Sequence, residues 1–318
     1  MAKPDFKLVA LLIPGLCLVF NSACSRSGRE RVVEASSSAP AAPTAETPEP
    51  KSPEEQLVEP QVNSEIQRME AERRAALLKD AESAIAETRN ALAALDQGDK
   101  AAAQSALQRA SGKLKTVVSQ DPKLAFAPID VSTSVIDLYA SPDTVKRVVN
   151  QAKDQLGNGQ VQAARHLVSN LASEANLNVV GIPLGTYPAQ IQAIAPLIDA
   201  GRLDEAKAAL QTALHTLVIQ TYVVPLPRVR AQALVHRARE IATKTSRSPD
   251  DNNQLRNLVE GARNEIRLAE ALGYGNKSDY KPLYAELDEV EKKADNGQSG
   301  GSLFDKIEQS LRSFRFSS

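Results

Sequence analysis

The sequence predicts a mainly α-helical protein: a bundle of helical hairpins with short extended or β segments between the hairpins, preceded by a long disordered tether. Among the 318 residues, 42% are hydrophobic and only 4% are aromatic, and the helix formers Ala, Leu, Gln, Glu and Lys are abundant. Three stretches share one hairpin pattern centred on a glycine. The segments that follow these stretches are β-branched and punctuated by proline, and they lack helical periodicity.

The first 23 residues have the features of a signal peptide of the lipoprotein type. Two lysines precede an apolar run over residues 8–20, which is shorter than the roughly 20 residues that a membrane-spanning helix needs. The run ends in NSAC, residues 21–24, which resembles a bacterial lipobox with Asn21 in place of the usual Leu. We therefore expect an acylated Cys24 that anchors a periplasmic protein to a membrane of the cell envelope. The alternative is ordinary signal cleavage with Cys24 left unmodified.

Cysteine usage favours acylation. The chain has two cysteines, and Cys17 lies inside the segment that cleavage would remove. Cys24 would then be the only thiol of the mature protein, with no intramolecular partner. A lone exposed thiol in an oxidising compartment is a liability, and lipidation removes it.

Residues 25–63 predict a disordered linker, and residues 64–318 predict a helical domain. The stretch SSSAPAAPTAETPEPKSPEEQ has almost no side chains to bury, so burial cannot offset the entropy of ordering it. From Ser64 onward, apolar residues recur mostly at spacings of three and four. We expect one uninterrupted helix that ends at Gly98.

The hairpin pattern surrounds Gly98, Gly159 and Gly201. Each glycine has an aliphatic residue three positions before it, an alanine five positions after it and another aliphatic residue nine positions after it. The glycine permits a left-handed cap, and the alanine lets two helices approach closely. In chain order these positions are Leu95, Ala103 and Leu107; Leu156, Ala164 and Val168; and Ile198, Ala206 and Leu210.

An extended segment follows each hairpin, at residues 124–132, 176–187 and 218–227. These segments either pack as extended walls across the helices or form the strands of one small sheet. Further helices are predicted after Pro142 and after Pro227.

The C-terminal part predicts helices joined by a short turn. Ser248 is expected to cap a helix that ends at Leu272, and Gly273 is expected to take a positive φ. In the next helix, Tyr280 and Tyr284 are one turn apart and should pack near Leu268 and Leu272 of the preceding helix. Tyr274, in the turn itself, should be the most exposed of the three tyrosines. A nucleotide loop is not favoured, because GYGN lacks both a third glycine and a preceding strand. Residues 303–314 predict a short amphipathic helix.

Several stretches resemble the YfdX family of bacterial stress-associated proteins. AEALGYGNKSDYKPLYAELDEVEKK, residues 269–293, resembles that family's C-terminal signature, and AIAETRNALAALDQGDKAAAQSAL resembles one of its helical hairpins. The resemblance extends over about residues 70–314. It implies a mainly helical, exported and oligomerising protein linked to acid, drug or envelope stress, for which chaperone-like behaviour has been proposed. It implies no catalytic residues.

The sequence offers little support for an enzyme, a metal site, a cofactor site or a nucleic-acid-binding protein. A formal net charge of −1 provides no basic field for nucleic acid. The three histidines, His166, His215 and His236, lie in separate helical stretches without metal-binding spacing. A Gly-x-Ser-x-Gly match at residues 297–301 lies in a joint between two helical patterns, whereas a nucleophile elbow follows a strand.

Tyrosines are the candidate contact residues. Tyr139, Tyr187, Tyr222 and Tyr274 lie in or beside the extended segments and the C-terminal turn. They either converge on one amphipathic groove or serve separately at the edge of the core. We expect a non-enzymatic envelope stress protein whose groove binds unfolded clients or small hydrophobic compounds. The alternative is a structural or regulatory adaptor, a homo-oligomer that docks a specific envelope partner.

Overall fold

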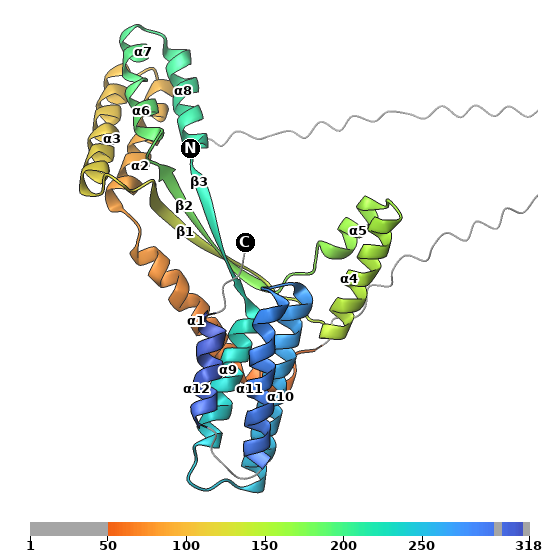
Figure 1. The fold of residues 1–318 in the computed structure, drawn as a ribbon. Helices are drawn as coiled ribbons and strands as arrows, with labels where there is room; N and C mark the ends of the chain where they lie inside the picture. Colours follow the sequence, from red (N-terminus) through yellow and green to blue (C-terminus); the bar gives the residue numbers. More distant parts are fainter. Residues whose placement is uncertain (1–49, 296–300, 314–318) are drawn as a thin grey trace, which may run out of the picture. The chain divides into compact units, whose positions relative to one another are not determined.

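The computed structural model describes residues 50–295 and 301–313, and it confirms the mainly α-helical prediction. A three-stranded sheet of order β1-β2-β3 runs between two groups of helices (Figure 1). The predicted signal peptide, Cys24, most of the predicted linker and Phe314 lie outside the described residues. Among the described residues, none of the helices combines the length and the apolar character that a membrane crossing requires.

The elements follow one another with short connections. Their bounds are α1 Pro53–Ala75, α2 Lys79–Asp96, α3 Lys100–Gln120, β1 Phe126–Ile136, α4 Pro142–Gly157, α5 Val161–Val168, β2 Glu174–Pro183, α6 Tyr187–Gln192, α7 Ala195–Asp199, α8 Leu203–His215, β3 Val218–Pro225, α9 Leu226–Ala242, α10 Pro249–Leu272, α11 Lys277–Asp295 and α12 Gly301–Ser313.

The predicted linker ends earlier than residue 63, and that part of the prediction is wrong. Helix α1 begins at Pro53, where Ser52 and Glu55 form a reciprocal capping box. Val58 and Val62 are buried although most of their neighbours are polar. A helix that buries only one narrow stripe has a polar average composition, which resembles that of a linker. The folded part therefore includes residues 53–63 rather than beginning at Ser64.

The predicted uninterrupted helix from Ser64 to Gly98 is also wrong. It is divided into α1 and α2 by a break after Ala75, and the backbone N–H of Leu78 donates instead to the carbonyl of Pro128 in β1, at 3.0 Å. The two helices contribute to different hydrophobic cores. The periodicity of three and four continues through the break, which is why the sequence pattern did not reveal it.

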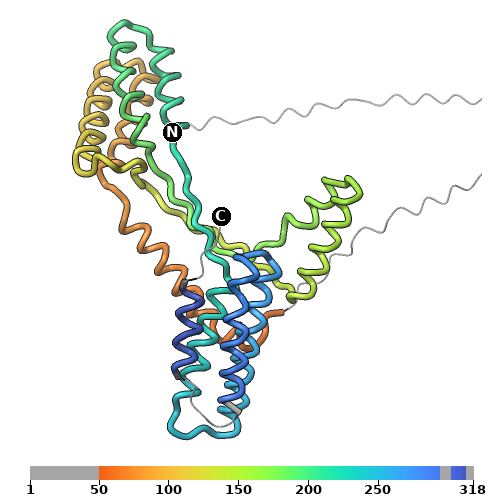
Figure 2. Tube along the Cα trace, viewed as in Figure 1, coloured from red at the N-terminus to blue at the C-terminus, as the bar shows by residue number. Residues whose placement is uncertain are grey.

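The three extended segments form one small antiparallel sheet, which decides between the two alternatives (Figure 2). Strand β2 is central, with Val131 of β1 opposite Val179 and Tyr222 of β3 opposite Leu177. Gly181 in β2 lies under the Phe126 ring, so that an added Cβ would clash with the ring. Glycine is required there by the close approach of the two strands.

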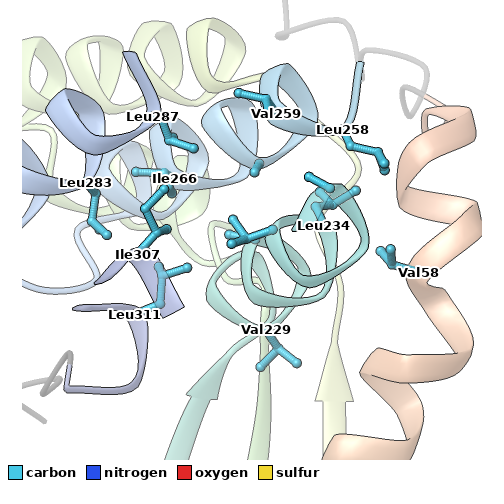
Figure 3. Packing of buried hydrophobic residues seen from close by; sticks show 14 of the residues in the cluster. Val58, Val229, Leu234, Leu258, Val259, Ile266, Leu283, Leu287, Ile307 and Leu311 are labelled. Atoms are coloured by element: carbon cyan, nitrogen blue, oxygen red, sulfur yellow. The ribbon is translucent and has the colours of Figure 1, made fainter. Parts of the chain in front are cut away.

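Two hydrophobic cores share the sheet. The long-helix core unites α1 and α9–α12 with Ala175, Leu177 and Val224 of the sheet. Figure 3 shows part of it, where Val58 of α1 lies near Leu234 of α9. The hairpin core unites α2, α3 and α6–α8 with Ala127 and Ile182 of the sheet and with Leu184 just beyond β2. Strand β2 thus contributes to both cores.

The glycine-centred hairpins are α2–α3, α4–α5 and α7–α8. Gly98, Gly159 and Gly201 take φ values of 76°, 72° and 72°, as the left-handed cap requires. The three alanines five positions later are all buried. The aliphatic positions are buried in the first and third hairpins, whereas Leu156 and Val168 of the second are exposed, contrary to expectation.

The joint between α10 and α11 agrees with most of its prediction. Gly273 has a φ of 83°, Tyr280 is buried in the long-helix core, and Tyr284 packs against that core. The α10 residues in this core include Ile266 and Ala269, not Leu268 and Leu272. Positions 268 and 272 lie on a different face of the helix, because successive residues are turned by about 100°.

Candidate functional site

An apolar groove lies on one face of the sheet, beside the break between α1 and α2. We call it the sheet groove, and its volume is about 460 Å³. Its residues are Arg73, Ala76, Leu78, Val117, Gln120, Asp121, Leu124, Phe126, Pro128, Val179, Gln220 and Tyr222. Side chains two residues apart in a strand share a face, which places Phe126 with Pro128 and Gln220 with Tyr222 on this floor.

Helix α1 is held against the sheet beside this groove. The hydroxyl of Thr133 in β1 donates to Glu70 Oε2 at 2.7 Å, and Arg74 Nη2 donates to the carbonyl of Val131 at 3.3 Å. The guanidinium of Arg73 lies 3.9 Å from the centre of the Tyr222 ring. Such a cation–π contact orients the exposed tyrosine along the groove. The arrangement suits a flat apolar group with a polar end.

A second concavity lies where α1 begins, at the loop between β1 and α4 and beside α9 and α10. We call it the polar pocket; its volume is about 430 Å³ and its residues include Lys51, Glu55, Tyr139, Arg230 and Glu265. Arg230 is buried, and its Nη2 lies 2.6 Å from Asp137 Oδ2. Burial alone would raise the pKa of Asp137, but Arg230 and the nearby Lys51 hold it below its ordinary value.

Glu265 is the most unusual group of the polar pocket. Its side chain is buried on α10, and its Oε2 has no hydrogen-bond partner among the described residues. Burial raises the pKa of Glu265 well above its ordinary value, against the lowering effect of Arg230, and Glu55 raises it further by repulsion and by sharing a hydrogen bond. The carboxyl is therefore protonated over a wider pH range than an exposed glutamate.

Tyr274 connects the C-terminal turn to the sheet. Its hydroxyl donates to Glu174 Oε2 at 2.7 Å and accepts from the backbone N–H of Ser173 at 3.0 Å. The Ser173 hydroxyl in turn donates to Asp137 Oδ1 at 3.1 Å. Burial and the Glu174 carboxylate raise the pKa of Tyr274. The network fixes the turn, in which Tyr274 is half-buried like Tyr284, whereas Tyr280 is buried.

The four candidate tyrosines do not converge on one groove. Tyr222 lies in the sheet groove, and Tyr139 lies in the polar pocket with Lys51 Nζ 5.3 Å from its ring centre. Tyr187 cannot contact a partner, because it is fully buried in the hairpin core, where its hydroxyl donates to Thr88 Oγ1 at 3.2 Å. Tyr187 and the proline after it form the first turn of α6, so this pair of residues indicates the start of a helix and not a surface for a partner.

Sequence reasoning missed the charged residues of the polar pocket. Arg230 and Glu265 occupy core positions of α9 and α10, where the neighbouring periodic positions are apolar. A charged residue at such a position was the available signal. Asp137, the partner of Arg230, lies far away in the sequence, so the sequence alone did not show that these two charged residues would meet.

The three histidines remain apart. His166, His215 and His236 are all exposed, and they lie on α5, α8 and α9. In the part of the chain that the structure describes, no group of three or more His, Cys, Asp and Glu residues is placed to hold a metal ion. His236 Nε2 lies 3.7 Å from Glu240 Oε1, and its Nδ1 lies 3.5 Å from Glu308 Oε1.

The comparison with protein families decides the family of the central region. The YfdX protein family model matches residues 84–223. This region belongs to the YfdX family. The YfdX match runs from within α2 to the end of β3, so it contains most of the hairpin core, the α4–α5 hairpin and the sheet. It is narrower than the predicted resemblance over residues 70–314, and residues 269–293 lie outside it.

A solved structure of YfdX from Salmonella Typhi is similar to part of the chain. It is 17% identical, it covers 47% of this chain and 93% of its own, and the TM-score is 0.33. Among curated proteins, no relative matches.

Proposed function

We propose that this YfdX-family protein is a non-enzymatic protein of the cell envelope that binds small hydrophobic compounds, or the apolar side chains of unfolded clients, in the sheet groove. The observation that carries the proposal is the groove itself. It combines Leu124, Phe126 and Val179 with an exposed Tyr222. Apolar concavities with a few polar groups are the usual form of sites for hydrophobic ligands.

The residues around the groove fit such a ligand. Arg73 and Asp121 provide one positive and one negative group, Gln120 and Gln220 add neutral polar groups, and the other residues of the groove are apolar or aromatic. Charged residues make up 24% of the chain, which keeps a protein with an exposed apolar groove soluble. The polar pocket fits this function less well, because charged side chains such as Lys51, Arg230 and Glu265 line it.

The test compares two tyrosines with similar exposure. Tyr222 is 39% exposed in the groove, and Tyr139 is 42% exposed in the polar pocket. Tyr222→Ala should weaken binding of the apolar dye anilinonaphthalene sulfonate by roughly three- to tenfold, as the loss of aromatic contact predicts. It should also reduce the suppression of aggregation of reduced insulin. Tyr139→Ala should change neither. Equal effects of the two substitutions, or an unmodified protein that binds no dye, would refute the proposal.

The location in the envelope forms a separate part of the proposal. It rests on the signal-peptide pattern and on Cys24, which lie outside the described residues. Mass spectrometry of the mature N-terminus should find a diacylated or triacylated Cys24, and Cys24→Ala should release the protein into the soluble envelope fraction. A mature N-terminal peptide with an unmodified Cys24 would contradict the lipid anchor.

An adaptor that oligomerises and docks an envelope partner is the second candidate. The observation that favours it is the set of exposed apolar residues on the α4–α5 hairpin. A protein that acts only through such docking would bind neither dye nor insulin, and the comparison of Tyr222 with Tyr139 therefore separates the two candidates.

A further inference from the structure

Two of the three glycine-centred hairpins pack on each other with an internal two-fold relationship. The first helix of each hairpin packs on the second helix of the other, α2 on α8 and α3 on α7. Asp96, two positions before Gly98, forms an ion pair with Lys207, six positions after Gly201, at 3.3 Å. Reciprocally, Asp199, two positions before Gly201, accepts a hydrogen bond from Gln104, six positions after Gly98.

The apolar positions obey the same symmetry. Leu95 and Ile198, three positions before their glycines, are buried in the hairpin core, as are Leu107 and Leu210, nine positions after them. Each of these positions in one hairpin thus has an equivalent position in the other hairpin, and both side chains are buried in the core that the two hairpins share. The pattern that the sequence repeats is therefore the pattern of an interface between hairpins.

The α4–α5 hairpin has the same pattern without the pairing. Gly159 takes the same left-handed conformation, and Ala164 is buried between the two helices. Leu156, however, is 54% exposed, Val168 is 46% exposed and Val161 is 56% exposed. Leu156 and Val168 hold the positions that are buried in the other two hairpins, and in this hairpin the described residues leave them about half exposed.

The uncovered positions continue a buried stripe. Val145, Ala152 and Leu156 recur at spacings of seven and four and so lie on one face of α4. The stripe is buried at Val145 and Ala152 and exposed at Leu156, one residue before the end of α4. Helix α4 packs on α10, which holds the hairpin to the long-helix bundle.

We propose that the tip of the α4–α5 hairpin packs against the same tip of a second copy of this chain, in the two-fold arrangement that α2–α3 and α7–α8 adopt within one copy. In that arrangement α4 of one copy lies on α5 of the other, and Leu156 and Val168 become buried on both sides. A two-fold interface uses the same surface twice, which a hairpin of this pattern already does inside the chain.

Charge complementarity supports a second copy as the occupant. Arg165 holds the position of Lys207, six residues after the glycine, and its counterpart two positions before the glycine is Gly157. Gly157 is the last residue of α4, where the free carbonyl groups give the helix end a partial negative charge. Each Arg165 thus faces a helix C-terminus of the other copy, with the acidic Asp154 one turn earlier.

The size of the surface fits a modest dimer. The two helices have 16 and 8 residues, and part of α4 already packs on α10, so the tip offers fewer residues than the roughly 20–30 that one side of a standard interface uses. None of these residues belongs to the sheet groove, so the dimer and the ligand-binding function are independent of each other.

The first experiment measures the dimer by analytical ultracentrifugation of the full chain, in a background where Cys17 and Cys24 are replaced by Ser. Leu156→Glu and Val168→Glu should each raise the dissociation constant of the dimer at least tenfold, while the melting temperature stays unchanged because both side chains are exposed. Leu57→Glu is the matched control, since Leu57 is a 44% exposed leucine on α1. It should leave the dimer intact.

The second experiment tests the two-fold geometry. One batch of the same protein carries Gly157→Cys and another carries Arg165→Cys; an added Cβ at Gly157 meets no atom within 4 Å. Oxidation of the mixture should link one copy of each variant by a disulfide, and this mixed dimer should form faster than either variant forms a disulfide with itself. A monomer at 100 µM, a dimer insensitive to Leu156→Glu and Val168→Glu, or no preference for the mixed disulfide would each overturn the proposal.

Discussion

The hairpin core and the long-helix core differ in the polar groups they bury. In the described residues of the hairpin core, the buried polar side chain is Thr88, which donates to the Ala84 carbonyl at 2.8 Å. Around the long-helix core, Arg230, Arg263, Glu265 and Glu308 are all buried. One bundle is held by close apolar contact, and the other also encloses charges that must be paired.

The residues that match the family model lie mostly in the hairpin core and the sheet, and the long-helix bundle lies mostly outside the match. The match leaves out α1 and α9–α12. Alanine at close contacts makes the hairpin core sensitive to added volume. The charged groups make the long-helix bundle sensitive to the loss of a partner, because an unpaired buried charge is costly.

Arg230→Met should have the largest effect on stability. It leaves Asp137 without its closest cation, and breaking a buried ion pair typically costs about 3–5 kcal/mol. Lys207→Met, which removes the ion pair with Asp96 on the hairpin core, should cost less than about 1 kcal/mol because that pair is exposed. Urea denaturation of both variants measures the difference. Similar costs would mean that the two bundles do not differ in this respect.

Tyr284→Ala should come next. The ring packs against the long-helix core and its hydroxyl donates to Glu270 Oε2 at 2.8 Å. The ring is half-buried, so we expect a loss of about 2 kcal/mol, below the range for fully buried aromatic side chains. Tyr284→Phe, which removes only the hydrogen bond, should cost about 1 kcal/mol. Normal stability with lost dye binding in Tyr284→Ala would assign the residue to a ligand instead of the core.

Ala206→Leu tests close packing in the hairpin core. Ala206 is fully buried, and added methylene groups in a well-packed core cost roughly 1–3 kcal/mol. Ala163→Leu is the control, because Ala163 is an exposed alanine on α5. Thermal denaturation should show a lower midpoint for Ala206→Leu alone. An unchanged midpoint would show that the alanine does not mark a close contact.

Glu265→Gln should have the opposite sign at neutral pH. Because the pKa of Glu265 is raised in the folded protein, the folded state binds more protons than the unfolded state, and stability falls as pH rises above the ordinary glutamate pKa. The glutamine variant lacks this loss and should be more stable than the parent at pH 7, but not at pH 4.

Glu87→Gln provides the comparison in the hairpin bundle. Its hydrogen bond with Arg109 lowers the pKa of Glu87, so its contribution is present at neutral pH and is lost as pH falls through the folded pKa. This variant should be slightly less stable than the parent at pH 7 and equal to it in acid. Urea denaturation at pH 4 and pH 7 gives the change in the stability difference between each variant and the parent as pH rises. A change of the same sign for Glu265→Gln and Glu87→Gln would contradict the pKa shifts.

The sequence by itself determined the features that depend on neighbouring residues. The left-handed glycines of the three hairpins and of the turn after α10 could be predicted because only glycine adopts that conformation without strain. Ser141 and Ser248 cap α4 and α10 as helix-start rules require. The buried alanines five residues after the hairpin glycines follow from the same local geometry.

Only the tertiary structure decided which surfaces meet. Residues 53–63 fold as part of α1 because α9 offers them an apolar face, and in the break after Ala75 the Leu78 N–H donates to the carbonyl of Pro128 in the sheet. The same holds for Arg230, Asp137 and Glu265, which come from three separate parts of the chain. The hairpins with one shared pattern differ in burial for this reason: Leu95 and Leu156 hold equivalent positions, and burial depends on whether another hairpin lies opposite.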